Sequence, residues 1–335
     1  MEILIGLIII AAGAFCQSSS YVPIKKVRRW SWESFWLVQG IFAWLVFPLL
    51  GASLAVPQGH SLVEIFTADA RAVWLTVLFG ALWGVGGLTF GLSMRYLGVA
   101  LGQSIALGTC AALGTVLAPV LTGHAASLTF SVLSGVVVTL AGIAVIGIAG
   151  SMKAKSLSEE AKRAAVKDFN FTKGITVALL AGLMSACFNI GLDFGSGICF
   201  DGTPELYRTL PATFLVTLGG FVTNAGYCLV QNFRNSTFGD YADRRVYANN
   251  LLFCCLAGAL WYSQFFGLSL GKGFLASSPV LLTFSWCILM ALNVTFSNVW
   301  GVILREWQGT GFRTRAVLAA GLVILIISSF LPQII

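Results

Sequence analysis

The sequence predicts an all-α integral membrane protein with ten transmembrane helices, and three observations lead to this fold class. Of the 335 residues, 57% are hydrophobic and only 10% are charged, whereas a soluble domain carries about 25% charged residues. The apolar residues gather into stretches of about 20, the length at which an α-helix crosses a hydrocarbon core of roughly 30 Å. The charges fall between these stretches. This pattern argues against a soluble enzyme.

Ten apolar stretches are long enough to cross a bilayer as helices. The first is expected to remain in the protein rather than to be cleaved as a secretory signal, because its basic cluster follows the apolar run instead of preceding it. In chain order the stretches cover residues 3–22, 34–56, 72–92, 97–121, 128–149, 175–195, 211–232, 247–270, 276–304 and 314–335.

Lys and Arg concentrate in alternate loops of this arrangement. All but three of the 20 basic residues lie after the first, third, fifth, seventh and ninth stretches, and the exceptions are Arg71, Arg208 and Lys272. By the positive-inside rule, these five loops are cytoplasmic and both termini are periplasmic. The net charge of +7 therefore indicates topology. No nucleic-acid partner is expected, because the basic residues are dispersed over five loops.

The longest polar segment divides the stretches into two sets of five. Residues 1–150 form the first set, residues 151–174 a cytoplasmic linker, and residues 175–335 the second set. Because five is odd, two repeats of this kind insert with opposite orientations, which predicts two inverted five-helix repeats with a binding site near the membrane midplane. Within the linker, residues 156–165 form either an interfacial helix or a solvated connection.

Glycine spacing in the third stretch predicts close packing between helices. Gly80 and Gly84, and then Gly87 and Gly91, are each separated by three residues, so each pair presents bare backbone on one helix face. The eight cysteines lie within or at the ends of the apolar stretches, and His60 and His124 lie in different loops. Because no metal-ligand spacing occurs, neither a metal site nor a cofactor is expected.

Ionisable residues inside a membrane span are functional candidates, because burying a charge there costs on the order of 3 kcal/mol. Asp193 is the acidic residue inside a predicted span, and it either couples proton movement or caps the span in the headgroup region. Glu33 and Glu306 stand at cytoplasmic ends of spans. We expect these two carboxylates either to form ion pairs with Arg29 or Arg305 or to join a proton exit path.

Neutral amides and aromatic rings in the spans would suit a polyhydroxyl ligand, because amides both donate and accept hydrogen bonds and indole faces stack on sugar C–H groups. Each of these residues could equally join helices through hydrogen bonds. Asn224 and Asn293 belong to the same class, while Trp30, Trp32, Trp36 and Trp307 fit an interfacial aromatic belt. The candidate ligand residues are Gln17, Tyr21, Trp83, Asn189, Trp261, Tyr262, Gln264, Trp286 and Asn298.

One catalytic pattern occurs, in which residues 267–271 match G-x-S-x-G around Ser269. That motif requires a strand-to-helix turn beside a histidine and an acid, and here it lies in an apolar span. A membrane-embedded hydrolase using Ser269 is therefore the lesser alternative, and no catalytic residue is expected.

Six short segments carry a resemblance to a known family. Residues 25–33, 79–84, 94–98 and 261–266, together with Ser285-Trp286 and Arg305-Glu306-Trp307, keep their order along the chain. They resemble the L-rhamnose-proton symporter family of the drug/metabolite transporter superfamily. The resemblance does not include Asp193, where that family has a neutral residue, or residues 287–300.

The resemblance implies a secondary active transporter in the bacterial inner membrane. Its expected activity is uptake of L-rhamnose or a related deoxy sugar together with a proton by alternating access, in contact with membrane lipid. An exporter of drugs or metabolites on the same fold is the alternative. The oligomeric state, the stoichiometry and the exact sugar are left open by the sequence.

Overall fold

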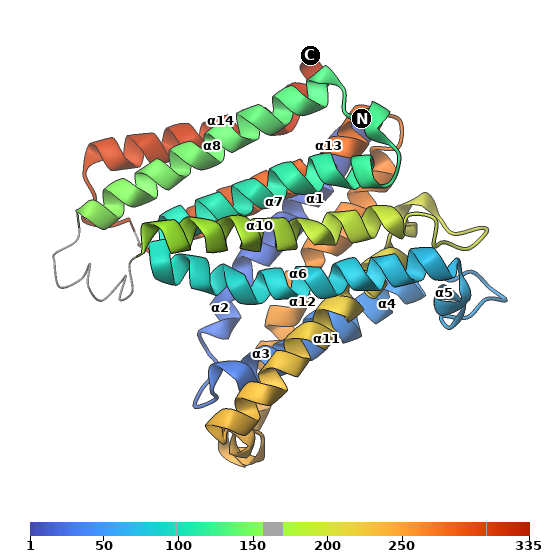
Figure 1. Ribbon diagram of the computed structural model, residues 1–335, viewed down its shortest axis with the longest axis horizontal. Coiled ribbons are helices and arrows are strands. Elements are labelled where there is room, and N and C mark those ends of the chain that lie inside the picture. The colour runs from blue at the N-terminus through green and yellow to red at the C-terminus, as the bar shows by residue number, and fades with distance from the viewer. Residues whose placement is uncertain (98, 157–169, 306) are drawn as a thin grey trace. The chain divides into compact units, whose positions relative to one another are not determined.

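The computed structural model describes residues 1–97, 99–156, 170–305 and 307–335, and over these residues the chain is helical with no strand (Figure 1). Ten helical segments of the described chain are long and apolar enough to cross a membrane, which confirms the predicted number. They comprise Glu2–Ile24, Trp32–Ser53, Ala70–Met94, Gly102–Leu121, Phe130–Lys155, Thr172–Phe194, Glu205–Asn235, Arg244–Phe274, Pro279–Ile303 and Phe312–Ile334.

Several spans consist of more than one helical element. The helices are α1 (Glu2–Ser19), α2 (Tyr21–Ile24), α3 (Trp32–Gly40), α4 (Phe47–Ser53), α5 (Glu64–Thr67), α6 (Ala70–Leu97), α7 (Val99–Leu121), α8 (Phe130–Lys155), α10 (Phe171–Phe194), α11 (Leu210–Asn235), α12 (Arg244–Phe274), α13 (Pro279–Ile303) and α14 (Phe312–Ile334). A π-helix, η1 (Ile41–Val46), joins α3 to α4. Short 3-10 helices are η2 (Ala125–Ser127), η3 (Glu205–Tyr207) and η4 (Phe238–Ala242).

The chain forms two compact units, each built from two separate segments. Unit 1 contains Met1–Gly84 and Gly191–Phe274, and unit 2 contains Val85–Ile190 and Leu275–Ile335. This division into compact units does not test whether residues 1–150 and 175–335 are inverted repeats, because repeats are defined by symmetry. The inverted repeats therefore stay a prediction. The alternatives for linker residues 156–165 concern a segment outside the described residues, apart from Ser156 at the end of α8.

In unit 1, glycines let α1 and α12 approach at the level of the backbone. A Cβ atom at Gly13 would lie 2.7 Å from the Ser263 carbonyl oxygen, and one at Gly271 would lie 2.9 Å from the Gly6 carbonyl oxygen. A Cβ at Gly267 would lie 3.0 Å from the Ile9 carbonyl oxygen. Contacts this close leave no room for a larger side chain, so small residues decide which faces of the two helices meet.

The glycine pairs of α6 behave differently from each other. A side chain at Gly80 would collide with the Val216 carbonyl on α11, and one at Gly84 would lie 2.9 Å from the Gly220 carbonyl oxygen. The packing prediction is therefore confirmed for this pair. A Cβ at Gly87 or Gly91 would meet nothing within 4 Å among the described atoms, so the same prediction is wrong for the second pair. Spacing identifies bare backbone but does not say whether a neighbour uses it.

Unit 2 is organised by α8, which packs against α7 and α14. Ile143 and Ile146 of α8 share a buried cluster with Leu318 and Leu325 of α14. A Cβ at Gly142 would lie 2.7 Å from the Leu325 side chain, so α8 and α14 are also in close contact. The α8 helix begins at Thr129, whose hydroxyl accepts a hydrogen bond from the Val132 N–H at 3.4 Å, as is typical of an N-cap.

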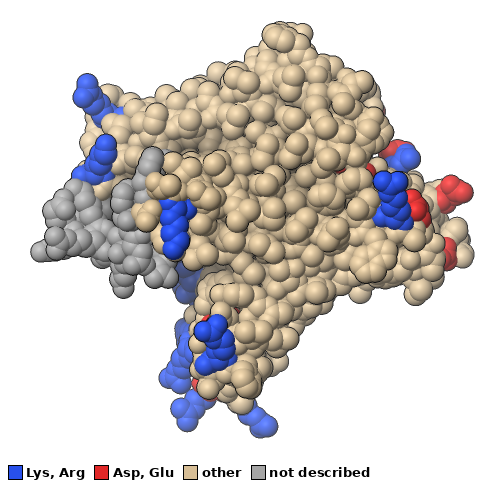
Figure 2. All heavy atoms as spheres, viewed as in Figure 1, with Lys and Arg blue, Asp and Glu red and all other residues tan. Residues whose placement is uncertain are grey.

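Charge is unequal at the two ends of unit 1. Lys and Arg gather at the end where α11 passes into α12, and the visible Asp and Glu lie mainly near α5 (Figure 2). The basic end contains residues 25–29 together with Arg234, Arg244 and Arg245. This unequal charge is the pattern on which the predicted cytoplasmic and periplasmic sides depend.

Candidate functional site

Three indole rings from separate helices meet in unit 1. Trp44 lies on η1, Trp83 on α6 and Trp261 on α12. The Trp44 ring centroid is 6.0 Å from that of Trp83 and 5.9 Å from that of Trp261, and the last two are 5.7 Å apart. Trp36 extends this group, with its ring centroid 5.5 Å from Trp44. We refer to Trp36, Trp44, Trp83 and Trp261 as the indole cluster.

The local sequence explains how the second span presents Trp44. Pro48 has no N–H to donate to the carbonyl four residues earlier, that of Trp44. The preceding Phe47 N–H bonds to the Phe42 carbonyl five residues back, which is the π-helical pattern often found at functional sites. A Cβ at Gly40 would lie 2.5 Å from the Trp44 ring. Glycine therefore lets this ring lie flat along its own helix.

Three buried polar atoms on the helices that carry the indole cluster lack a hydrogen-bond partner within the described part of the chain. They are Trp44 Nε1, Gln39 Oε1 and the Tyr262 hydroxyl. The residues that carry them are 3%, 2% and 6% exposed. Gln39 lies two residues before η1, and Tyr262 follows Trp261 on α12. Because buried polar groups in proteins are nearly always hydrogen-bonded, these atoms offer one donor, one acceptor and one group of both kinds to a bound molecule.

Asn224 of α11 positions the edge of the indole cluster. Its Oδ1 accepts a hydrogen bond from Trp36 Nε1 at 3.0 Å. Its Nδ2 donates to the Gly220 carbonyl at 2.9 Å and to the Gly84 carbonyl at 3.3 Å. One amide therefore links α3, α6 and α11, and it uses both its donor and its acceptor in doing so. Asn224 is a structural residue of this site.

Of the predicted ligand residues in unit 1, Trp83 and Trp261 come together in the indole cluster. The Tyr262 ring lies beside Phe266, and its hydroxyl lies beside Gly51 of α4. Gln264 is buried, but its Nε2 donates to the carbonyl of Trp261 on its own helix at 3.2 Å. Gln17 is half-buried and accepts a hydrogen bond from the Ser18 hydroxyl at 3.4 Å. Tyr21 is 57% exposed.

The other predicted ligand residues belong to unit 2. The Asn189 side-chain NH₂ donates to the Gly114 carbonyl at 2.9 Å, while its Oδ1 has no partner among the described atoms. Trp286 stacks on Phe188 at 5.8 Å and donates from Nε1 to the Cys110 carbonyl at 3.3 Å. Asn298 donates to the Val294 carbonyl of its own helix at 2.9 Å. Asn189 Oδ1 is thus a buried acceptor of unit 2 that could take a further hydrogen bond.

The predicted proton-coupling residue, Asp193, lies in the last turn of α10 in unit 1. The side chain of Lys272, in the last turn of α12, lies within range of its charge. Opposite charges at partly buried positions stabilise each other's ionised form. The sequence placed Lys272 among three isolated basic residues and did not predict this pairing.

The second candidate, Glu33, belongs to a hydrogen-bonded network at the basic end of unit 1. Its Oε1 accepts from the Asn235 side-chain NH₂ at 2.9 Å and from the Thr237 hydroxyl at 3.0 Å. The expected pairing of Glu33 with Arg29 is wrong, because Arg29 lies 3.8 Å from Asp243 instead. Arg29 has a φ of 60°, a left-handed turn that directs its side chain elsewhere. Glu306 lies outside the described residues.

The same network contains Asn232 and Asp240, and we call these residues with Ser31, Ser34, Glu33, Asn235 and Thr237 the polar clasp. The Ser34 hydroxyl donates to Asn232 Oδ1 at 2.9 Å, and the Ser31 N–H and hydroxyl both donate to Asp240 Oδ2 at 2.8 Å. Burial would raise the pKa of the Asp240 carboxyl, but these hydrogen bonds hold that pKa below its ordinary value. The polar clasp fastens the 25–31 loop to the loop between α11 and α12.

Comparison with known proteins gives the family. A sequence model of the L-rhamnose-proton symport protein (RhaT) family matches residues 1–333. The chain belongs to this family. It is 32% identical to the L-rhamnose-proton symporter of Mannheimia succiniciproducens, over 98% of this chain and 96% of the relative. Identity is 33% to the symporter of Cronobacter sakazakii and 31% to that of Escherichia coli K12, each over 95% of this chain and 93% of the relative. The family resemblance predicted from the sequence is confirmed.

As a member of a symporter family, the protein is a transporter rather than an enzyme, and the geometry around Ser269 agrees. The Ser269 hydroxyl is buried inside α12, accepts from the Thr209 hydroxyl at 2.7 Å and donates to the Leu206 carbonyl at 3.2 Å. Gly267 and Gly271 of the G-x-S-x-G pattern are the positions where α1 approaches α12. The pattern therefore reflects helix packing.

Sequence reasoning missed three residues of the site. Trp36 was assigned to the interfacial belt, yet its Nε1 bonds to Asn224 and its ring joins the indole cluster. Trp44 and Gln39 were not singled out. An available signal was the run from Gln39-Gly40 to Pro48, in which an amide, a glycine and a proline interrupt an apolar span. Such interruptions mark places where a membrane helix departs from regular α geometry.

Proposed function

We propose that the protein takes up L-rhamnose or a related deoxy sugar together with a proton, and that the sugar binds at the indole cluster. The observation that carries this proposal is that the helices bearing the indole rings also hold three buried polar atoms without a partner in the described chain, Trp44 Nε1, Gln39 Oε1 and the Tyr262 hydroxyl. Membership of the family supports the substrate class, since its curated relatives are named L-rhamnose-proton symporters.

The chemistry of a deoxy sugar fits this arrangement. Its hydroxyl groups would accept from Trp44 Nε1, donate to Gln39 Oε1 and do either with the Tyr262 hydroxyl. Its methyl group and C–H face would pack on the indole rings of Trp83 and Trp261, which contribute burial and stacking. A hydroxyl in place of the methyl group would be desolvated against the rings without a partner, at a cost of about 1–3 kcal/mol. The cluster would therefore select a deoxy sugar over its hydroxylated analogue.

Proton movement would supply the energy for accumulation. One proton moving inward yields roughly 2.3 kcal/mol per 100 mV of membrane potential. A tenfold concentration ratio of a neutral sugar costs about 1.4 kcal/mol. We propose Asp193 as the proton carrier, because protonating it would release Lys272 from its opposite charge and change the interactions between the ends of α10 and α12. Glu33 is the second candidate.

Alternating access would expose the sugar to each side of the membrane in turn, with the two predicted repeats moving against each other. The concentration of Lys and Arg in alternate loops supports a topology with both termini in the periplasm of a bacterial inner membrane. In this topology Asp193 lies toward the periplasmic side, from which protons enter.

Uptake of labelled L-rhamnose into proteoliposomes tests the proposal. The protein should accumulate the sugar only with an inward proton gradient. Asp193→Asn should abolish accumulation but retain gradient-free exchange of internal for external sugar, because exchange requires binding and access but no net proton movement. Asp201→Asn, which removes an exposed acid from the following loop, is the matched control and should accumulate sugar normally.

Three other results would revise the proposal. Loss of both exchange and accumulation in Asp193→Asn would make Asp193 a binding or structural residue rather than the proton carrier. Normal accumulation in that variant would move the role to Glu33, tested as Glu33→Gln. Failure of the folded wild-type protein to take up L-rhamnose or other deoxy sugars, with transport of apolar or cationic compounds, would favour the exporter alternative.

A further inference from the structure

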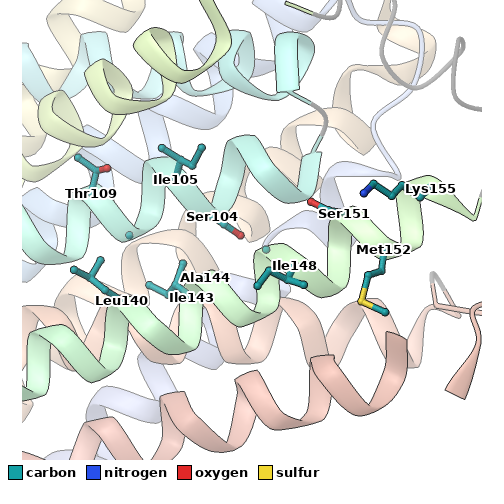
Figure 3. A pocket seen from close by; sticks show the side chains of 12 residues that line it. Ser104, Ile105, Thr109, Leu140, Ile143, Ala144, Ile148, Ser151, Met152 and Lys155 are labelled. Carbon is teal, nitrogen blue, oxygen red and sulfur yellow. The ribbon is translucent and has the colours of Figure 1, made fainter. Parts of the chain in front are cut away.

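A groove lies between α7 and α8 in unit 2, and none of the residues that line it belongs to the indole cluster. Its volume is about 670 Å³. Figure 3 shows side chains of the two helices bordering it, with Lys155 and Ser151 toward one end and Leu140 and Thr109 toward the other. The proposed sugar site uses none of these residues.

Glycine at two positions keeps the groove open. A Cβ at Gly147 of α8 would lie 2.8 Å from the Ser104 hydroxyl oxygen of α7, so the helices touch there. A Cβ at Gly108 of α7 would lie 3.4 Å from the Leu140 side chain, which is ordinary contact. The helices therefore meet at the floor of the groove, and no large side chain fills the space above it.

The lining changes from charged to apolar along the groove. Lys155 stands in the last turn of α8, and the hydroxyls of Ser151 and Ser104 come next. Ile148, Ala144 and Leu140 line the remainder. Ile148 is 55% exposed and Ala144 is also exposed, so this part of the groove is open to its surroundings. A charged end, a hydroxyl zone and an aliphatic track correspond to the three zones of a phospholipid.

The length of the aliphatic and hydroxyl zones matches one leaflet of a bilayer. Leu140 and Ser151 are eleven positions apart on α8, or about 16 Å along the axis at 1.5 Å per residue. One leaflet is about half of a hydrocarbon core roughly 30 Å thick. The groove therefore extends from the membrane surface to near the midplane, as far as an acyl chain does.

Two lysines share the last turn of α8, and the structure separates their roles. Lys153 Nζ lies 4.8 Å from the Trp307 ring centroid in a cation-π contact. Lys155 lines the groove. We propose that the groove binds an anionic phospholipid, with one acyl chain along Ile148, Ala144 and Leu140 and the headgroup phosphate at Lys155. A basic residue near a membrane surface attracts such a headgroup with about 1 kcal/mol.

Native mass spectrometry of the purified protein tests this site with palmitoyl-oleoyl phosphatidylglycerol and with phosphatidylcholine of the same chains. Wild type should retain phosphatidylglycerol more strongly. Lys155→Gln should weaken phosphatidylglycerol binding about 5-fold, which corresponds to about 1 kcal/mol, and weaken phosphatidylcholine binding less, because the choline cation offsets the charge of its phosphate. Ala144→Phe, which fills the aliphatic track from an exposed position, should weaken both lipids, and Lys155→Arg should restore the preference.

Lys26→Gln is the matched control, since it removes one exposed cationic charge from unit 1 and should leave both affinities unchanged. Equal losses in Lys26→Gln and Lys155→Gln would mean that net charge attracts the lipid, and the site would be rejected. Competition by glycerol 3-phosphate as strong as that by phosphatidylglycerol would show that the acyl chain contributes nothing, which also overturns the proposal. The proposal would also be overturned if the Ala144→Phe variant unfolded at the wild-type temperature and bound both lipids as wild type does.

Discussion

Unit 1 holds two groups of buried polar side chains that differ in how completely they are paired. In the polar clasp, the carboxylates of Glu33 and Asp240 and the amide of Asn232 all have hydrogen-bond partners. On the helices that carry the indole cluster, Gln39 Oε1, Trp44 Nε1 and the Tyr262 hydroxyl have none within the described chain. The same is true of two further groups, Trp30 Nε1 and the Tyr241 hydroxyl, which also have no hydrogen-bond partner within the described chain.

This difference in pairing predicts which group of side chains contributes to stability and which contributes to binding. A satisfied buried network contributes to stability, and removing one member leaves another unpaired at a cost of about 1–3 kcal/mol. A buried polar group without a partner already carries that cost in the unliganded protein. Removing that polar group therefore changes the free energy of unfolding little and can even raise it. The polar clasp should therefore respond to mutation through folding, and the indole cluster through transport.

The largest effect is expected for Trp44→Ala in the indole cluster. Truncation removes an aromatic stacking partner and an N–H donor together, about 2–3 kcal/mol in all. We expect L-rhamnose uptake efficiency to fall roughly 30- to 100-fold. Trp44→Phe keeps a ring but loses the donor, and it should lose roughly 5- to 10-fold. Initial uptake rates in proteoliposomes measure both.

The control for this prediction is Trp74→Phe, at an exposed indole of α6 outside the indole cluster. It should transport at the wild-type rate. An equal loss in Trp74→Phe and Trp44→Phe would remove the distinction between the indole cluster and other tryptophans.

In the polar clasp, Asn232→Ala should lower the free energy of unfolding by about 1–3 kcal/mol, because it removes the acceptor of the Ser34 hydroxyl and one of the two acceptors of the Thr237 hydroxyl. Thermal unfolding in detergent should show a fall of several degrees in Tm. Transport per folded molecule should be unchanged. A transport defect in a variant of normal stability would give the polar clasp a functional role that its geometry does not predict.

Gln39→Leu should show the opposite behaviour. Leucine has no buried carbonyl to leave unpaired, so Tm should be unchanged or slightly raised. The apparent KM for the sugar should rise by about tenfold, as expected for the loss of a hydrogen bond worth about 1.4 kcal/mol. A marked fall in Tm with an unchanged KM would show that Gln39 is a packing residue instead.

The smallest effect concerns pH. Hydrogen bonds from Ser31 lower the pKa of Asp240, so the ionised carboxylate stabilises the fold above its ordinary pKa of about 3.9. This stabilisation is lost as the pH falls through the lower, folded-state pKa. Because Asp240 is only partly buried, Asp240→Asn should cost no more than a few tenths of a kcal/mol at neutral pH. Unfolding curves at several pH values should show the difference from wild type shrinking as the pH falls below about 4.

The sequence predicted the fold well because the membrane imposes a length on each helix. The ten predicted stretches agree with the ten spans of the described chain to within several residues at each end. The candidate site was predicted less completely. Trp83, Trp261 and Tyr262 were identified as residues of unusual chemistry in apolar helices, whereas the partners of Asp193 and Glu33 were not, because Lys272, Asn235 and Thr237 come from other segments.

By itself, the sequence determined the number of spans, the asymmetry of charge between their ends and the family to which the chain belongs. Hydrophobic length, loop charge and ordered motifs are properties of the chain that need no knowledge of neighbours. Only the tertiary structure decided which glycines make contacts and which buried polar atoms lack partners. A helix that is apolar on every side carries no periodic signal of its packing face, so the difference between Gly80 and Gly87, or between Asn232 and Gln39, appears only once the helices are packed.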